Sequence, residues 1–272
     1  MNILASLQSR KVGLVQIILM GLYVYLKNWK PILLVFSILD LPFIVVFATF
    51  LSQLQNISLG KFLVFLLIFL VIYIFPSIAN SVAIAVITNN YLQDFDIGYQ
   101  SILRKITTSF IPLLSLKFQF GFGYLIVCLL TLPFTIIPLS LLFYLFLLSD
   151  ASIFSLLAAY VFNGMGIIYA VSNGYYDLAF ILRNKSGQEA FDYSCSVVEG
   201  NWWRVFYWIM FSDLVRRGFL EIFRQVRNIF PLNNTFFIYL LSLTILVLTG
   251  TVIQISSILL FLNLDYRKSV EN

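Results

Sequence analysis

The chain contains no histidine among its 272 residues. This absence excludes His-based acid/base catalysis, His-containing triads and His metal sites. Only two cysteines are present, Cys128 in an apolar run and Cys195 in a polar stretch. Two such cysteines cannot supply the usual zinc ligands, and their surroundings give no support to a disulfide. We therefore expect no metal, no cofactor and no enzyme activity.

Charged residues are also scarce, at 11% of the chain, whereas soluble domains carry about 25%. Hydrophobic residues make up 61% and aromatic residues 17%. A soluble fold of this length could not hide so much apolar surface from water. The composition therefore predicts an all-α, polytopic transmembrane helix bundle in which lipid is the solvent.

The apolar runs predict a single membrane domain over 1–272, with about six spans. An N-terminal helix within 1–30 is too short to cross easily, so we expect it to be interfacial or re-entrant, and retained rather than cleaved. A helix bundle follows over 31–264, and a short polar tail over 265–272. The predicted spans are 31–51, 62–88, 109–132, a fourth that ends near Leu182, a fifth that begins at Trp202, and 235–262. We expect a bend at Pro76 in the second span and a turn at 133–138 after the third. Asp150 or Ser152 is expected to cap the fourth span. A short helix is expected within 183–201.

Six crossings place both termini on one face of the membrane. Eleven of the 17 basic residues then share that face, which favours it as the cytoplasmic one by the positive-inside rule. We expect the membrane to be the cell membrane. The net charge of +5 has the same explanation, so nucleic acid is not an expected partner. The residues on that face are Arg10, Lys11, Lys27, Lys30, Arg104, Lys105, Arg183, Lys185, Arg204, Arg267 and Lys268.

A weak internal repeat is visible in three segments that lead into apolar runs, 22–31, 102–112 and 194–204. Each carries basic or Trp residues just before the run. A threefold repeat would produce this pattern, and so would the interfacial anchors that precede any membrane helix. Both explanations remain open at this point.

Residues 188–210 read QEAFDYSCSVVEGNWWRVFYWIM. The pattern of Ala190, Ser194, Gly200, Trp203, Arg204 and Phe206 resembles the membrane domain associated with glycerophosphoryl diester phosphodiesterases. The closing sequence at 264–268 (LDYRK) is similar to that family's ending after its last span. The resemblance implies a six-span bacterial integral membrane protein. The catalytic barrel of the family is a separate domain of about 250 residues, for which this chain has no room.

The same motif has a direct physical interpretation. Gly200 and Asn201 are expected to break a helix, Trp202 and Trp203 to lie at headgroup level, and Arg204 to snorkel toward water.

Six charged residues interrupt the fifth apolar segment, and two arrangements can accommodate them. The helix could leave the membrane near Ser212 and lie on its surface, with an ion pair between Asp213 and Arg217. Alternatively, the charged face could line a cavity in which Arg216, Arg217 and Arg224 hold a phosphate or carboxylate. Both make the arginines a candidate site for anionic lipid. The site residues are Arg216, Arg217, Arg224 and Arg227.

Polar side chains inside apolar runs are a second candidate site, because an ionisable group at membrane depth is costly unless it has a role or a partner. The residues are Asp40, Asn80, Asn163, Asp177 and Gln254. They could hydrogen-bond one another in the bundle or line a pathway.

The function predicted from these features is that of a non-enzymatic integral membrane protein. Its expected partners are anionic lipid, another membrane protein or a second copy of itself. The alternative is a transporter or channel subunit for a small solute, anionic solutes included. A third hypothesis is a membrane-embedded enzyme that acts on a lipid. The sequence contains no set of catalytic residues that would support it.

Overall fold

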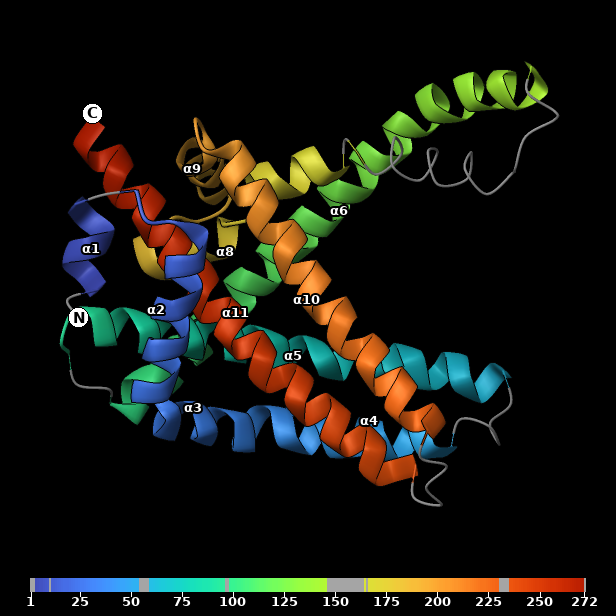
Figure 1. Ribbon diagram of the computed structural model, residues 1–272, viewed down its shortest axis with the longest axis horizontal. Helices are drawn as coiled ribbons and strands as arrows, with labels where there is room; N and C mark the ends of the chain where they lie inside the picture. The colour runs from blue at the N-terminus through green and yellow to red at the C-terminus, as the bar shows by residue number, and fades with distance from the viewer. Residues whose placement is uncertain are drawn as a thin grey trace.

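The computed structural model describes residues 3–9, 11–53, 59–95, 98–145, 164, 166–229 and 235–271. Within these ranges every regular element is a helix, which confirms the all-α prediction (Figure 1). The elements are α1 (Ile3–Ser9), α2 (Leu14–Lys27), α3 (Trp29–Val35), the π-helical turn η1 (Phe36–Asp40), α4 (Leu41–Gln53), α5 (Leu59–Leu92), α6 (Tyr99–Leu145), α8 (Tyr176–Arg183), α9 (Gln188–Val198), α10 (Trp202–Ile229) and α11 (Thr235–Glu271).

Three helices in the described part are long and apolar enough to cross a membrane: Trp29–Thr49, Tyr99–Leu130 and Tyr239–Val270. They match the first, third and sixth predicted spans. The chain is therefore compatible with a membrane protein. The full set of six spans and the threefold repeat remain predictions.

The first of these helices is continuous through α3, η1 and α4 but widens into a π-turn at its centre. Pro42 explains the widening. Proline has no N–H to donate, and its ring clashes with the carbonyl four residues earlier, so a locally wider helix relieves both problems. Asp40 is the last residue of this turn. Pro31 lies in the first turn of α3, as predicted.

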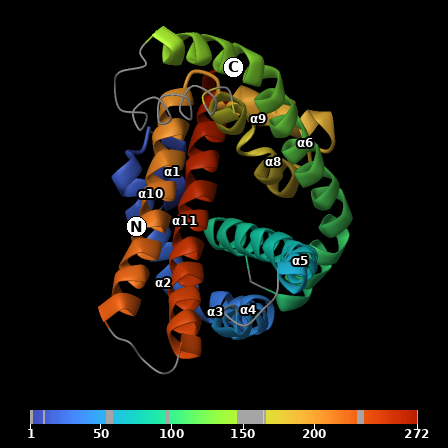
Figure 2. The same ribbon diagram turned by 90° about the vertical axis from the view of Figure 1, so that its right-hand side faces the viewer.

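The turn predicted at 133–138 is wrong, because α6 is one helix of 47 residues. Pro112, Pro133 and Pro138 all fall inside it. A proline removes one hydrogen bond and can bend a helix without ending it. Figure 2 shows α6 curving along its length around the other helices. Its length of about 70 Å exceeds the bilayer core of about 30 Å.

The fourth predicted span is interrupted at its C-terminal end. The chain is helical over 166–173, turns at Gly174 and Tyr175, and resumes as α8. The Ser194 hydroxyl on α9 fills the break, since it accepts a hydrogen bond from Tyr175 N at 3.0 Å and donates one to Ser172 O at 3.1 Å. A side chain at Gly174 would place its Cβ 2.9 Å from a backbone carbonyl. The predicted caps Asp150 and Ser152 lie outside the described residues.

The two C-terminal helices are also longer than predicted. α10 runs unbroken through Ser212 to Ile229 beside α11, so the helix does not turn away at Ser212 (Figures 1 and 2). α11 continues to Glu271, so residues 265–271 of the predicted short polar tail are helical. Asp265 in this stretch is only 5% exposed, because partners on α8 and α9 bind its charge.

The N-terminal region packs against the C-terminal half of α11. α1 and α2 both contact α11, and the buried face of α2 includes Ile17, Met20 and Val24. The two helices approach closely at Gly21, where a Cβ would overlap the Ser256 hydroxyl. Gly21 therefore permits the two helices to pack closely, as small residues do in membrane helix pairs.

We expect Gly21→Val to destabilise the protein. Overpacking of this contact should cost about 1–3 kcal/mol, because Ser256 is completely buried and its backbone lies on the same side. Thermal unfolding in mild detergent, followed by circular dichroism, measures the effect. Gly250→Val is the matched control, because Gly250 is also helical and has no atom within 4 Å of its Cβ position. Equal loss in both variants would contradict close packing at Gly21.

Candidate functional site

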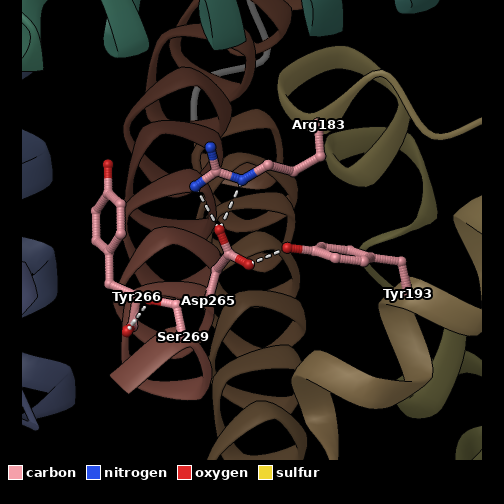
Figure 3. A network of polar contacts seen from close by, with 5 residues as sticks. All are labelled: Arg183, Tyr193, Asp265, Tyr266 and Ser269. Atoms are coloured by element: carbon pink, nitrogen blue, oxygen red, sulfur yellow. Dashed lines mark hydrogen bonds and ion pairs between the residues drawn. The ribbon is translucent and has the colours of Figure 1, made fainter. Parts of the chain in front are cut away.

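The most densely connected polar group in the described part of the chain surrounds Asp265, and we call Arg183, Tyr193 and Asp265 the Asp265 cluster (Figure 3). Arg183 is the last residue of α8, Tyr193 lies on α9 and Asp265 on α11. Arg183 Nε donates to Asp265 Oδ2 at 2.7 Å, and Nη2 contacts the same oxygen. Tyr193 donates its hydroxyl to Oδ1. Both carboxylate oxygens are thus occupied, and three elements meet at one buried charge.

The electrostatics of the cluster favour a structural pair. Burial lowers the pKa of Arg183, but the Asp265 carboxylate outweighs it, so the pKa of this guanidinium ends above its usual value. Burial and then the bond to Asp265 raise the pKa of Tyr193 to about 12. Near neutral pH Arg183 therefore stays charged and Tyr193 stays a donor. Neither group is poised to exchange protons, which argues against acid/base catalysis here.

Cation–π contacts extend the Asp265 cluster. The Arg183 guanidinium lies 5.7 Å from the ring centre of Tyr266, and Lys268 Nζ lies 5.2 Å from that of Tyr193. Lys268 also donates to the Ser196 hydroxyl on α9. The last turns of α11 are thereby joined to α8 and α9 by charged and aromatic side chains.

A second connection, two residues earlier on α11, holds the N-terminal segment. Asn263 is completely buried; its Nδ2 donates to Leu7 O at 2.7 Å and its Oδ1 accepts from Val12 N at 3.3 Å. Arg204 donates to Val12 O. The prediction that Arg204 snorkels toward water is therefore wrong. Its guanidinium turns inward because an open backbone carbonyl of the N-terminal segment lies within reach.

The motif residues of 188–210 have packing roles in this structure. Ala190 and Ser194 are completely buried, and Ser194 bridges the break before α8. Gly200 has a φ of +72°, a conformation that favours glycine, and it separates α9 from α10 as expected. Trp202 stacks on Phe206 at 5.3 Å. Trp203 is 64% exposed.

Two of the four predicted arginines can be described in detail. Arg216 and Arg217 are exposed neighbours on α10. The predicted ion pair is confirmed, since Arg217 Nε contacts Asp213 Oδ2 at 2.7 Å. Arg224 and Arg227 lie further along the same helix, and their side chains fall outside the described residues.

Among the predicted intramembrane polar residues that the structure describes, Asp177 has the best-defined surroundings. Asp177 accepts a hydrogen bond from Leu178 N at 2.8 Å and one from Ser81 on α5 at 3.4 Å, and the Lys117 charge on α6 interacts with it. Asp40 ends η1, while Asn80 lies on α5 and Gln254 on α11. Within the described residues no hydrogen bond joins any two of the predicted polar residues. Asn163 lies outside those residues.

Sequence reasoning missed the roles of Asp265, Asn263 and Ser194. Asp265 was interpreted as the end of a span because a charge after an apolar run usually marks the interface. One signal was available: Arg183 also ends an apolar run, so the two opposite charges could meet at the same depth. No comparable signal in the sequence links Asn263 to the Leu7 carbonyl and the Val12 N–H, which lie more than 250 positions away.

We expect Asp265→Asn to be far more destabilising than Asp213→Asn. Both remove the acid of an Asp–Arg pair, but Asp265 is buried and Asp213 is 49% exposed. Breaking a buried pair costs about 3–5 kcal/mol, and the partial exposure of Arg183 places this case at the lower end. Loss of the exposed pair costs under about 1 kcal/mol. Thermal midpoints of both variants in the same detergent provide the test, and similar shifts would refute the structural role.

Comparison of the chain with protein-family models, with curated proteins and with solved structures finds no match in any of the three. The resemblance to the membrane domain of glycerophosphoryl diester phosphodiesterases remains a prediction carried by the residues of 188–210 and 264–268.

Proposed function

We propose that this chain is a non-enzymatic, multi-pass protein of the cell membrane, with both termini cytoplasmic, that binds anionic lipid through α10. The observation that carries the proposal is the pair of exposed arginines, Arg216 and Arg217, on a helix that packs beside a candidate span. Asp213 neutralises Arg217 in part, whereas Arg216 has no ion pair with any described residue. An exposed guanidinium without an ion pair can bind a phosphate by two parallel hydrogen bonds.

The rest of the α10 surface supports contact with lipid. Large apolar side chains precede the arginines at helical spacing and are exposed from 40% to 69%: Trp203, Tyr207, Met210, Phe211 and Leu214. An apolar stripe that leads to Arg217, with Arg216 on the adjoining face, matches the order of acyl chain and headgroup in a lipid. A patch of this kind on a soluble monomer would be unusual.

The double variant Arg216→Gln/Arg217→Gln should bind anionic lipid more weakly. Each basic residue contributes about 1 kcal/mol to attraction of anionic lipid, so affinity should fall roughly 30-fold. Native mass spectrometry with graded phosphatidylglycerol measures this affinity, and phosphatidylcholine tests selectivity. Lys27→Gln/Lys30→Gln is the matched control, because it removes the same charge from two other exposed residues. If both double variants lose the same affinity for phosphatidylglycerol, the net charge of the protein explains the effect, and the proposed site on α10 is refuted.

A transporter or channel subunit is the second candidate, and η1 is the observation that favours it. π-turns inside helices are frequent at functional sites, and this one ends at an acid within a candidate span. α5, which carries Asn80, packs against η1. An acidic and an amide side chain on contacting elements could begin a polar pathway.

If Asp40 lines a pathway, its carboxylate binds the ion that passes through the membrane. Asp40→Asn removes this charge and should therefore lower the flux of that ion at least about tenfold. Proton flux into proteoliposomes, followed with a pH-sensitive dye, provides the readout. Asp94→Asn is the control, because Asp94 is exposed in a turn and asparagine also tolerates its φ of +55°. Wild-type flux no faster than that of empty liposomes would reject this candidate and leave the lipid-binding proposal standing.

A further inference from the structure

A hollow of about 440 Å³ lies beside the C-terminal end of α9 and the first residue of α10. Trp202 and Arg216 are fourteen residues apart on α10, about 21 Å along the axis, so the hollow is separate from the arginine pair. Two of its lining residues carry carboxylates, one carries an indole, and the others are neutral. The lining residues are Ser172, Asp192, Cys195, Ser196, Val198, Glu199 and Trp202.

The charge of the hollow is negative. Asp192 accepts a hydrogen bond from the neutral Gln188 amide at 3.0 Å, which leaves its charge in place. Neither Asp192 nor Glu199 forms an ion pair with a described residue, and both are exposed to an incoming ligand. Lys268 reaches the edge of the hollow through its bond to Ser196, but the two carboxylates outnumber it. A cation is therefore favoured over an anion.

The indole of Trp202 forms a fixed aromatic wall. Its ring stacks on Phe206 at 5.3 Å with an interplanar angle of 10°, and it meets Trp203 edge-on at 5.0 Å. These contacts hold the ring in place beside the hollow. Indole is the most favourable aromatic group for binding a cation, and it prefers ammonium groups that have shed part of their water.

The small number of acids favours an organic cation over a metal ion. Calcium takes about six to eight oxygen ligands, and the described residues contain no group of three or more acidic, cysteine or histidine side chains that could hold a metal ion. An ammonium group carried on methyl or methylene groups fills more space and is attracted by both acids without direct coordination. We propose that this hollow binds a small organic ammonium group, either a free amine or the amine of a lipid headgroup.

Isothermal titration in mild detergent with tetramethylammonium and choline tests the proposal. We expect saturable binding that weakens about tenfold in Asp192→Asn and in Glu199→Gln, and by several-fold in Trp202→Phe. Glu189→Gln is the matched control: it removes one negative charge from the same helix, outside the hollow, at a residue paired with Lys185 at 3.9 Å. Its affinity should equal that of the wild type.

Nanodiscs distinguish the two sources of the ligand. If a lipid headgroup occupies the hollow, choline should bind more weakly in phosphatidylcholine nanodiscs than in phosphatidylglycerol nanodiscs; a free amine should bind equally in both. The proposal is overturned if neither probe gives saturable binding, or if Glu189→Gln weakens binding as much as the two lining variants do. Arg216→Gln/Arg217→Gln should leave these affinities unchanged, so this result is independent of the anionic-lipid test.

Discussion

A buried carboxylate near the end of α11 is the constraint on which the arrangement of the C-terminal half depends. An unpaired charge in a low-dielectric interior costs several kcal/mol, so Asp265 must have partners. Arg183 and Tyr193 supply them and thereby fix the end of α8 and the middle of α9 against α11. Asn263, two residues earlier and therefore on nearly the opposite side of the helix, holds the N-terminal segment. One turn of α11 thus organises both its neighbouring helices and the start of the chain.

Three interruptions of the helical backbone in the described residues are either hydrogen-bonded by a neighbouring group or accommodated within the helix. The Ser194 hydroxyl bonds both sides of the break before α8. The π-turn at η1 accommodates Pro42, and α6 continues through its prolines as a curved helix. Unsatisfied backbone groups are expensive in an apolar environment, so a break requires a hydrogen-bonding partner close by.

The charged features separate into two kinds, and this separation supports the functional proposals. Arg183 and Arg204 are turned inward and bind protein groups, so they are used in folding. Arg216 lies outward on α10, and Asp192 and Glu199 lie outward around the hollow at α9. The outward arginines attract anions and the outward acids attract cations. The two faces could therefore bind the phosphate and the amine of membrane lipids at different places.

Composition and helical periodicity were sufficient to predict an all-α protein rich in apolar helices, the short helix within 183–201, the break at Gly200 and the Asp213–Arg217 pair. Each of these depends on contacts within a few residues, which the order of amino acids specifies directly. The continuity of α6, the break before α8, the inward turn of Arg204 and the helical end of α11 could not be obtained in this way. They depend on groups brought together from distant positions, since a proline, a charge or a polar side chain ends a helix only when packing offers it no partner. The sequence alone determined which segments are helical and apolar, and the tertiary structure decided where those helices end and which charges are left to bind a ligand.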